Sequence, residues 1–143
     1  MKKTLGVICL LLLVSVVALA APQVQTTNVQ PFPGTLINAR YVYVTSYDGD
    51  QFDPRLLPED RQAISSVQSA LQQWGRYIVV YRAKDADMIL VVQSRPSEDV
   101  LAVYDGRRPN DAFLWRAMGH QGLQKGETPL VTQLRQAVEQ ASK

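Results

Sequence analysis

A helical stripe followed by two apolar strands constrains the fold of this chain more than any other feature. Residues 57–93 read LPEDRQAISSVQSALQQWGRYIVVYRAKDADMILVVQ. In the first half, apolar residues recur at helical spacing, and they are Ala63, Ile64, Val67, Ala70, Leu71 and Trp74. This spacing predicts a helix over residues 58–74 with one face on a core. Pro58 suits the first turn of that helix, and Gly75 suits the left-handed residue that ends it.

Three further stretches have the composition of strands. Residues 77–81 (YIVVY) are β-branched and aromatic, and residues 40–47 (RYVYVTSY) alternate between polar and apolar side chains. Residues 88–92 (MILVV) form a continuous apolar run, which predicts a strand that is central in a sheet or covered on both faces. The polar stretch 82–87 between two of these strands is short enough for a hairpin.

The remainder of the chain adds a strand, an ambiguous segment and a second helix. Residues 100–104 (VLAVY) predict a strand, residues 112–118 (AFLWRAM) fit either a short strand or a helical turn, and residues 129–141 repeat apolar side chains at helical spacing. The element order predicts an α+β fold: a two-layer sandwich in which a mixed sheet of four to five strands packs two helices, 58–74 and 129–141, on one face. A right-handed crossover through the first helix would make strands 40–47 and 77–81 parallel.

The first twenty residues have the pattern of a signal peptide. Lys2 and Lys3 precede an apolar run over residues 5–20, which ends in Ala18-Leu19-Ala20, a small-x-small cleavage pattern. The run is shorter than the roughly twenty residues of a membrane-spanning helix. We therefore expect an exported protein, periplasmic or secreted, with no membrane span after cleavage; an uncleaved anchor is the alternative. Cys9 lies inside the run rather than at its end, which argues against a lipoprotein.

Removing residues 1–20 changes the charge balance. The chain has 15 Lys and Arg and 13 Asp and Glu, so without Lys2 and Lys3 the two totals become equal at 13 each. No general basic field remains, and we therefore expect no nucleic-acid partner. Because Cys9 is the single cysteine, the processed chain has no disulfide or thiolate metal site, and no cofactor is expected.

One domain is predicted for the processed chain, because its length supports a single core. Residues 21–39 are rich in Pro, Gln and Thr, which predicts a flexible lead-in, and residues 40–143 are assigned to the α+β domain. Within the lead-in, Pro31-Phe32-Pro33 is suited to docking as a short extended segment, although a plain linker is the simpler interpretation.

Several segments together resemble a family of short exported bacterial proteins with no assigned function. They are VYVTSYDG, FDPRLLPEDRQAI, ALQQWGRYIVV, ADMILVV, LAVYD, LWRAMGHQGL and PLVTQLRQAVE, within residues 41–139. More distantly, the layout is similar to the α/β domain of curli-secretion lipoproteins and to the amino-terminal domain of the Tol-Pal propeller protein. The resemblance implies an accessory or interaction domain of the cell envelope, and it carries no catalytic residues to transfer. The chain lacks the lipid-anchoring cysteine that is common in those proteins.

Candidate catalytic and metal-binding residues are few. His120 is the only histidine and could act as a general base, but no catalytic motif joins it to a nucleophile or an acid. Asp48, Asp50 and Asp53 cluster near a glycine, as hard-cation ligands do, but their spacing departs from the calcium-loop pattern and also fits two turns. These residues define one functional alternative, a small exported hydrolase or metal-dependent enzyme that uses His120 and the three aspartates.

Candidate binding residues lie near the second half of the sheet. Arg107 and Arg108, together with Arg116, could bind an anion or an acidic partner, or Arg107 and Arg108 could form a solvated turn that is balanced by neighbouring aspartates. Trp115 beside Arg116 would suit an interface anchor if exposed, and a core position otherwise.

The strand tyrosines provide one more candidate surface. If Tyr41 and Tyr43 share one exposed face, that face is a contact surface; otherwise they cover the second side of the sheet. The leading hypothesis is a non-enzymatic exported domain that binds an envelope protein. Besides the enzyme, a third interpretation is a ligand binder with an apolar pocket between sheet and helices.

Overall fold

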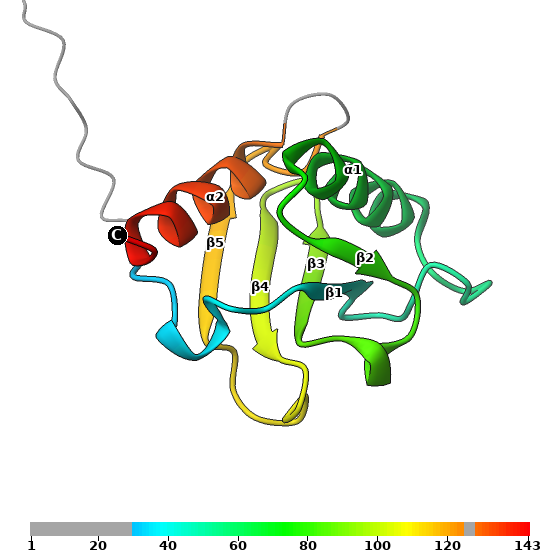
Figure 1. Cartoon of the computed structure of the whole chain (residues 1–143). Coiled ribbons are helices and arrows are strands. Elements are labelled where there is room, and N and C mark those ends of the chain that lie inside the picture. Colours follow the sequence, from blue (N-terminus) through cyan, green and yellow to red (C-terminus); the bar gives the residue numbers. More distant parts are fainter. Residues whose placement is uncertain (1–29, 125–127) are drawn as a thin grey trace, which may run out of the picture.

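The predicted two-layer α+β architecture is confirmed. The computed structural model describes residues 30–124 and 128–143, so the predicted signal peptide and residues 21–29 of the lead-in lie outside the described residues. Five strands form one mixed sheet, and both α-helices pack on the same face of it (Figure 1). The elements in chain order are η1 (Gly34–Leu36), β1 (Tyr41–Ser46), α1 (Pro58–Trp74), β2 (Ile78–Val80), η2 (Ala83–Asp85), β3 (Met88–Ser94), β4 (Asp99–Asp105), β5 (Trp115–Gly119) and α2 (Pro129–Ala141).

The sheet order is β2-β1-β3-β4-β5, which places β3 in the centre. Strand β1 runs parallel to both β2 and β3, as the crossover through α1 predicts for β1 and β2, whereas β3, β4 and β5 are antiparallel neighbours. The continuous apolar run of residues 88–92 is thus explained by a central position. The ambiguous segment 112–118 resolves as a strand, because Trp115–Gly119 pairs with β4.

The predicted hairpin at residues 82–87 is wrong. Strands β2 and β3 do not pair, because β1 lies between them and is parallel to both. The connection instead carries the single turn η2, and Asp87 fixes its end to β1: the Asp87 carboxylate accepts the backbone N–H groups of Arg40 and Tyr41 at 2.9 and 3.1 Å. Loop length permitted a hairpin, but the insertion of β1 between β2 and β3 decided the topology.

The folded domain begins before the predicted boundary at residue 40. Phe32 and Leu36 are each 4% exposed and belong to the main hydrophobic core, and the carbonyl of Gln30 accepts the indole N–H of Trp115 at 2.8 Å. The prediction of a flexible lead-in is therefore wrong for residues 32–39. The polar composition of the segment concealed two apolar side chains that pack against the domain.

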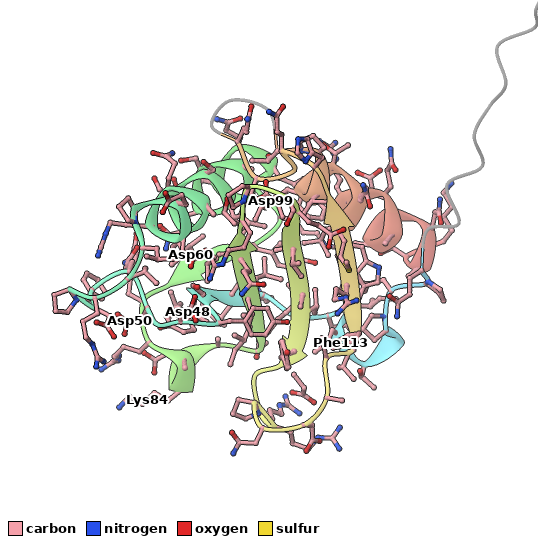
Figure 2. All side chains as sticks on the ribbon, turned by 180° about the vertical axis from the view of Figure 1, so that it is seen from behind. Asp48, Asp50, Asp60, Lys84, Asp99 and Phe113 are labelled. Carbon is pink, nitrogen blue, oxygen red and sulfur yellow. The ribbon has the colours of Figure 1, made fainter. Side chains whose placement is uncertain are left out.

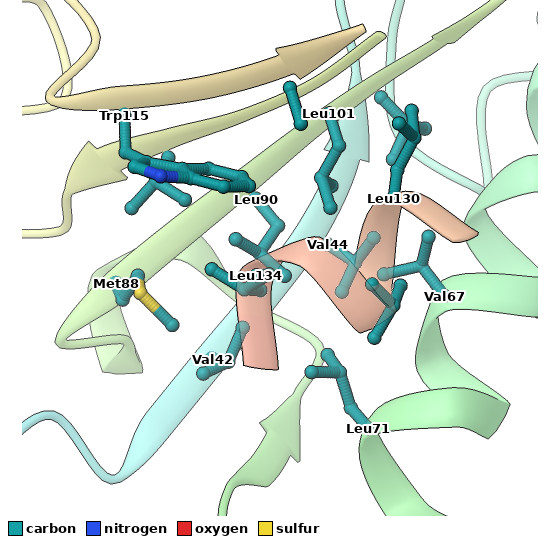
Figure 3. Packing of buried hydrophobic residues seen from close by; sticks show 14 of the residues in the cluster. Val42, Val44, Val67, Leu71, Met88, Leu90, Leu101, Trp115, Leu130 and Leu134 are labelled. Atoms are coloured by element: carbon teal, nitrogen blue, oxygen red, sulfur yellow. The ribbon is translucent and has the colours of Figure 1, made fainter. Parts of the chain in front are cut away.

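The main core lies between the sheet and the helices (Figure 3). Every second residue of the strands points into this layer, including Val42, Val44, Leu90 and Leu101, each at most 1% exposed. Helix α1 contributes Ile64, Val67 and Leu71, and helix α2 contributes Leu130, Leu134 and Val138, all of them 0% exposed. Full burial of such a side chain stabilises the fold by about 1.5–3 kcal/mol.

The ends of helix α1 follow the sequence signals. Pro58 is its first residue, and Gly75 after its last residue has a φ of 73°, with its N–H bonded to the carbonyl of Leu71 at 3.1 Å. Helix α2 begins after Thr128 as expected, although the Thr128 side chain makes no capping hydrogen bond.

Candidate functional site

No helix of residues 30–124 and 128–143 packs on the second face of the sheet, and we call it the open face. Figure 2 views the molecule from this side, with the sheet in front of both helices. Strand residues alternate between faces, so those that do not enter the core lie here. They are Ile78, Val80, Tyr41, Tyr43, Thr45, Ile89, Val91, Gln93, Val100, Ala102, Tyr104, Arg116 and Met118. The open face is therefore apolar over most of its strand positions.

Tyrosines organise the centre of the open face. Tyr43 and Tyr104 lie directly across from Ile89 on the two neighbouring strands, and Ile89 is only 6% exposed although no helix in the described part of the chain covers it. Cross-strand neighbours on one face are close enough to shield a side chain between them. The conditional prediction for Tyr41 and Tyr43 is thus resolved: the two residues share this uncovered face, on which Tyr41 is 41% exposed and Tyr43 is half-buried.

Tyr47, just after β1, joins this cluster through its hydroxyl group. The Tyr47 and Tyr104 hydroxyl oxygens are 3.3 Å apart. Burial, followed by the bond and proximity to Tyr104, raises the pKa of Tyr47 to about 12, against a smaller lowering by Arg116. Burial likewise raises the pKa of Tyr43. The Tyr43 and Tyr47 hydroxyls therefore stay protonated at neutral pH and offer uncharged hydrogen-bonding groups.

Large apolar side chains remain in water around this centre. Ile78 is 49% exposed and lies directly across from Tyr41, while Met118 at the other side of the sheet is 40% exposed. Phe113, before β5, is also 40% exposed (Figure 2). Large exposed apolar surfaces are uncommon on monomeric soluble proteins and mark interaction sites.

Arg116 supplies the only charge among the strand residues of the open face, all of which the structure describes. Its guanidinium lies 5.1 Å from the centroid of the Phe113 ring, within cation–π range. Within residues 30–124 and 128–143 it forms no ion pair, because no carboxylate oxygen lies within 4.0 Å of it.

Trp115 and Arg116 point to opposite faces, and only Arg116 is available for contacts. Trp115 is 1% exposed and packs in the main core (Figure 3). The prediction of Trp115 as a binding residue is therefore wrong, and the alternative that it is a core residue is confirmed. Alternation along β5 is the physical reason, since adjacent strand residues lie on opposite sides of a sheet.

Arg107 and Arg108 lie in the loop between β4 and β5, away from the strand positions of the open face. Arg108 is 3.5 Å from Asp105 and 3.6 Å from Asp111, and the Asp105 carboxylate also accepts the backbone N–H of Arg107 at 2.9 Å. These contacts match the alternative of a basic turn that neighbouring aspartates balance. Both arginines line a pocket with Leu36, Asp87 and Asp105, so their surroundings are acidic as well as apolar and do not include the strand positions of the open face.

The aspartate loop forms turns. Asp50 accepts the backbone N–H of Phe52 at 2.8 Å, and Asp53 accepts that of Arg55 at 2.9 Å. The side chain of Arg55, followed by its backbone N–H, lowers the pKa of Asp53. Among the described residues, no group of three His, Cys, Asp or Glu side chains is placed to hold a metal ion.

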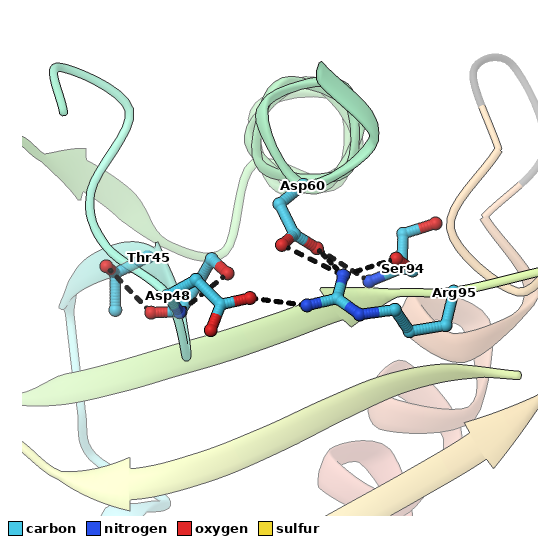
Figure 4. Close-up of polar contacts among 6 residues, drawn as sticks. Thr45, Asp48, Asp60, Ser94 and Arg95 are labelled. Atoms are coloured by element: carbon cyan, nitrogen blue, oxygen red, sulfur yellow. Dashed lines mark hydrogen bonds and ion pairs between the residues drawn. The ribbon is translucent and has the colours of Figure 1, made fainter. Parts of the chain in front are cut away.

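Asp48 takes part in a polar clasp, defined here by Asp48, Asp60, Ser94 and Arg95 (Figure 4). Arg95, directly after β3, bonds Asp60 at 3.0 Å and also pairs with Asp48. Asp60 on α1 is 0% exposed and accepts the backbone N–H of Ser94 at 2.8 Å. These carboxylate contacts, with Asp60 first, raise the pKa of Arg95. The clasp ties the first turn of α1 to the sheet and has a structural role.

His120 follows β5, in the loop before α2, and its Nδ1 lies 3.1 Å from the carbonyl oxygen of Ser97. It lines a pocket that also borders on Ser94, Arg95 and Asp99, but on none of the three loop aspartates. The hydroxyl of Ser94 donates to the buried Asp99 at 2.8 Å, so it is held by an acid rather than by the histidine. The enzyme alternative requires a pocket that His120 shares with the three loop aspartates. The pocket beside His120 does not include them.

Four residues of this surface were not predicted from the sequence: Tyr47, Tyr104, Phe113 and Met118. One signal was present: β1 and β4 carry large apolar residues at both alternate positions, as in VYV and VLAVY. A strand that is apolar on both faces needs a cover on each face, and the described residues supply only one helical layer.

Comparison of the chain with family models, with curated proteins and with solved structures finds no match. Of the helices in the part of the chain that the structure describes, none combines the length and the hydropathy required to cross a bilayer.

Proposed function

We propose that this chain is an exported protein of the cell envelope that acts without catalysis, by binding a partner protein on its open face. One observation carries the proposal. The sheet buries most of one face under two helices and leaves large apolar side chains of the other face 40–49% exposed, among them Tyr41, Ile78 and Met118.

The residue types on the open face support protein contact. Tyrosine, phenylalanine, methionine and arginine are enriched in protein interfaces relative to other surfaces. The contacts within the tyrosine cluster restrict the conformations of its side chains, because Tyr47 and Tyr104 are hydrogen-bonded to each other and Tyr43 packs over the buried Ile89. A surface with few rotamers left to order loses less entropy when it binds.

The compartment is supported by the sequence. The pattern of residues 1–20 predicts export. The resemblance to exported bacterial proteins, which is an expectation from the sequence segments within residues 41–139, would imply the same compartment. Sequencing the amino terminus of the protein from the periplasmic fraction and from the medium tests this part. A chain that starts at Ala21 in either fraction supports export, and a full-length chain in the cytoplasm contradicts it.

Site-specific photocrosslinking in the producing cells tests the use of the open face. We would place a photoreactive amino acid at Tyr41 or Met118, and as a matched control at Gln72, which is exposed on α1. We expect one discrete adduct from the two open-face positions and none from the control. An adduct that forms only from Gln72 would place the contact on the helical layer and reject the open face.

A folded variant then separates contact from stability. The double substitution Ile78→Ser and Met118→Ser removes apolar area from both sides of the open face, and Gln72→Ser with Gln140→Ser is its control on exposed helical positions. We expect the crosslink formed from Tyr41 to be lost in the first variant and retained in the second.

A further inference from the structure

The open face carries a positive charge without a counter-charge among the described residues of the same face, and this indicates the charge of a partner that covers it. Arg116 is exposed, carries the single charge of the strand positions on this face, and has no ion-pair partner within the described residues. If an apolar partner covered it, the guanidinium would lose water without compensation, which is costly. A partner that covers this face should therefore bring a negative charge to Arg116.

A second copy of the chain does not meet this requirement. In a face-to-face pair of open faces, the strand positions of the copy supply tyrosines, aliphatic residues and another Arg116, but no carboxylate. Such a pair would bury two cations without a counter-charge between them, and like charges in an interface are unfavourable.

The surroundings of Arg116 suit a carboxylate. Phe113 holds the guanidinium over its ring at 5.1 Å, while the planar fork of N–H groups is of the kind that binds a carboxylate with two hydrogen bonds. Tyr47 and Tyr104 add uncharged hydroxyl groups, and Met118 lies two residues along the same strand and the same face. Polar recognition and apolar contact thus lie side by side.

We propose that the open face binds an acidic segment of its protein partner, in which a carboxylate docks on Arg116 and flanking apolar side chains contact Phe113 and Met118. This inference rests on the proposed function and specifies the chemistry of the partner.

Peptide selection tests the inference and does not require that the partner be identified first. A displayed library of random dodecapeptides would be selected on the processed protein purified from the exported fraction. We expect enrichment of Asp or Glu next to apolar or aromatic residues. The most enriched sequence would then be synthesised, and its affinity measured by calorimetry for the wild-type protein and its variants.

Three substitutions of Arg116 set the expected order. Arg116→Gln should weaken the binding of the synthetic peptide by about tenfold or more. Arg116→Lys keeps the charge but loses the bidentate fork, so its affinity should lie between those of wild type and Arg116→Gln. Arg116→Glu should reverse the selection toward Lys and Arg. Because Arg116 is exposed, these variants are expected to fold, and circular dichroism would verify it.

The outcomes separate this inference from the proposed function. One outcome is that the selected peptides show no acidic enrichment, bind Arg116→Gln as well as wild type, and fail to bind the double variant Ile78→Ser with Met118→Ser. This outcome would overturn the inference of an acidic partner and retain the open face as the binding surface. Peptides that bind this double variant normally would overturn both.

Anionic lipid is the competing source of negative charge, and the same variants address it. We would measure sedimentation of the protein with vesicles of phosphatidylglycerol and phosphatidylcholine. Binding to these vesicles that Arg116→Gln abolishes, without acidic enrichment among peptides, would overturn the inference in favour of a membrane surface. Absence of vesicle binding together with acidic peptides supports it.

Discussion

The two faces of one sheet have different fates in this protein, although the same strands form both. On the covered face Val44, Leu90 and Leu101 are at most 1% exposed beneath the helices. On the open face Tyr41, Ile78 and Met118 keep at least 40% of their surface in water. Apolar side chains alone therefore do not distinguish core from contact surface. What distinguishes them is whether the chain supplies a layer to cover them.

The largest expected effect comes from a single residue of the covered face. Leu90→Ala should lower the free energy of unfolding by about 2–5 kcal/mol, because it leaves a cavity under the helices. Val91→Ala, the next residue on β3, is the matched control on the open face and should cost about 1 kcal/mol or less, since this side chain is only half-buried. Urea denaturation of both variants measures the contrast. Equal losses would show that the two faces are equally buried.

The polar clasp is the next test, because it ties helix α1 to the sheet. Arg95→Leu leaves Asp60 buried without its cation and should destabilise the fold by about 3 kcal/mol. Asp48→Asn is the control, because Asp48 is 49% exposed and its pair with Arg95 contributes less than about 1 kcal/mol. Thermal denaturation would compare the melting temperatures of the two variants. Similar small decreases in both would show that the pair of Arg95 with the buried Asp60 contributes no more than an exposed ion pair.

The hydrogen bonds by which Asp87 holds the start of β1 support both faces of the sheet, and the pH dependence of stability tests them. The N–H groups of Arg40 and Tyr41 lower the pKa of Asp87 below its ordinary value. Its contribution to stability is therefore complete above the unfolded pKa of about 4 and is lost as the pH falls through the folded pKa. Asp87→Asn should destabilise the protein at pH 7. As the pH is lowered from 5 to 2, the free energy of unfolding of this variant should fall by less than that of the wild type. Parallel stability curves for the two proteins in this interval would contradict the assignment.

The smallest effect on stability is expected on the open face. Ile78→Ser with Met118→Ser should change the free energy of unfolding by no more than about 1 kcal/mol, because 49% of the Ile78 surface and 40% of the Met118 surface are in water before the change. The same substitutions should abolish crosslinking from Tyr41. A large loss of stability in urea would show instead that these side chains serve the fold.

The elements predicted from sequence were those with strong local patterns. The apolar stripe of α1, its end at Gly75 and the central position of β3 each follow from a few adjacent residues. The errors arose where distant segments meet. The pairing of β1 between β2 and β3 replaced the expected hairpin, and Phe32 joined a core that is formed mostly from residues beyond position 40.

The candidate site was only partly accessible to sequence analysis. Arg116 was singled out, but its neighbour Trp115 was a core residue, because a strand sends adjacent side chains to opposite faces. The conditional surface of Tyr41 and Tyr43 could not be assigned until the position of the helices was known. Tyr47 reaches Tyr104 across 57 positions of the chain, and no local pattern encodes such a contact.

By itself, the sequence determined the α+β class, the two amphipathic helices and the apolar character of the strands, because these depend on the order of residues within a few turns or strand repeats. Only the tertiary structure decided which strand lies beside which and which apolar face stays open. Those outcomes depend on the sum of packing between distant segments: both helices settle on one side, their apolar stripes are satisfied there, and nothing in the described chain remains to cover Tyr41, Ile78 and Met118.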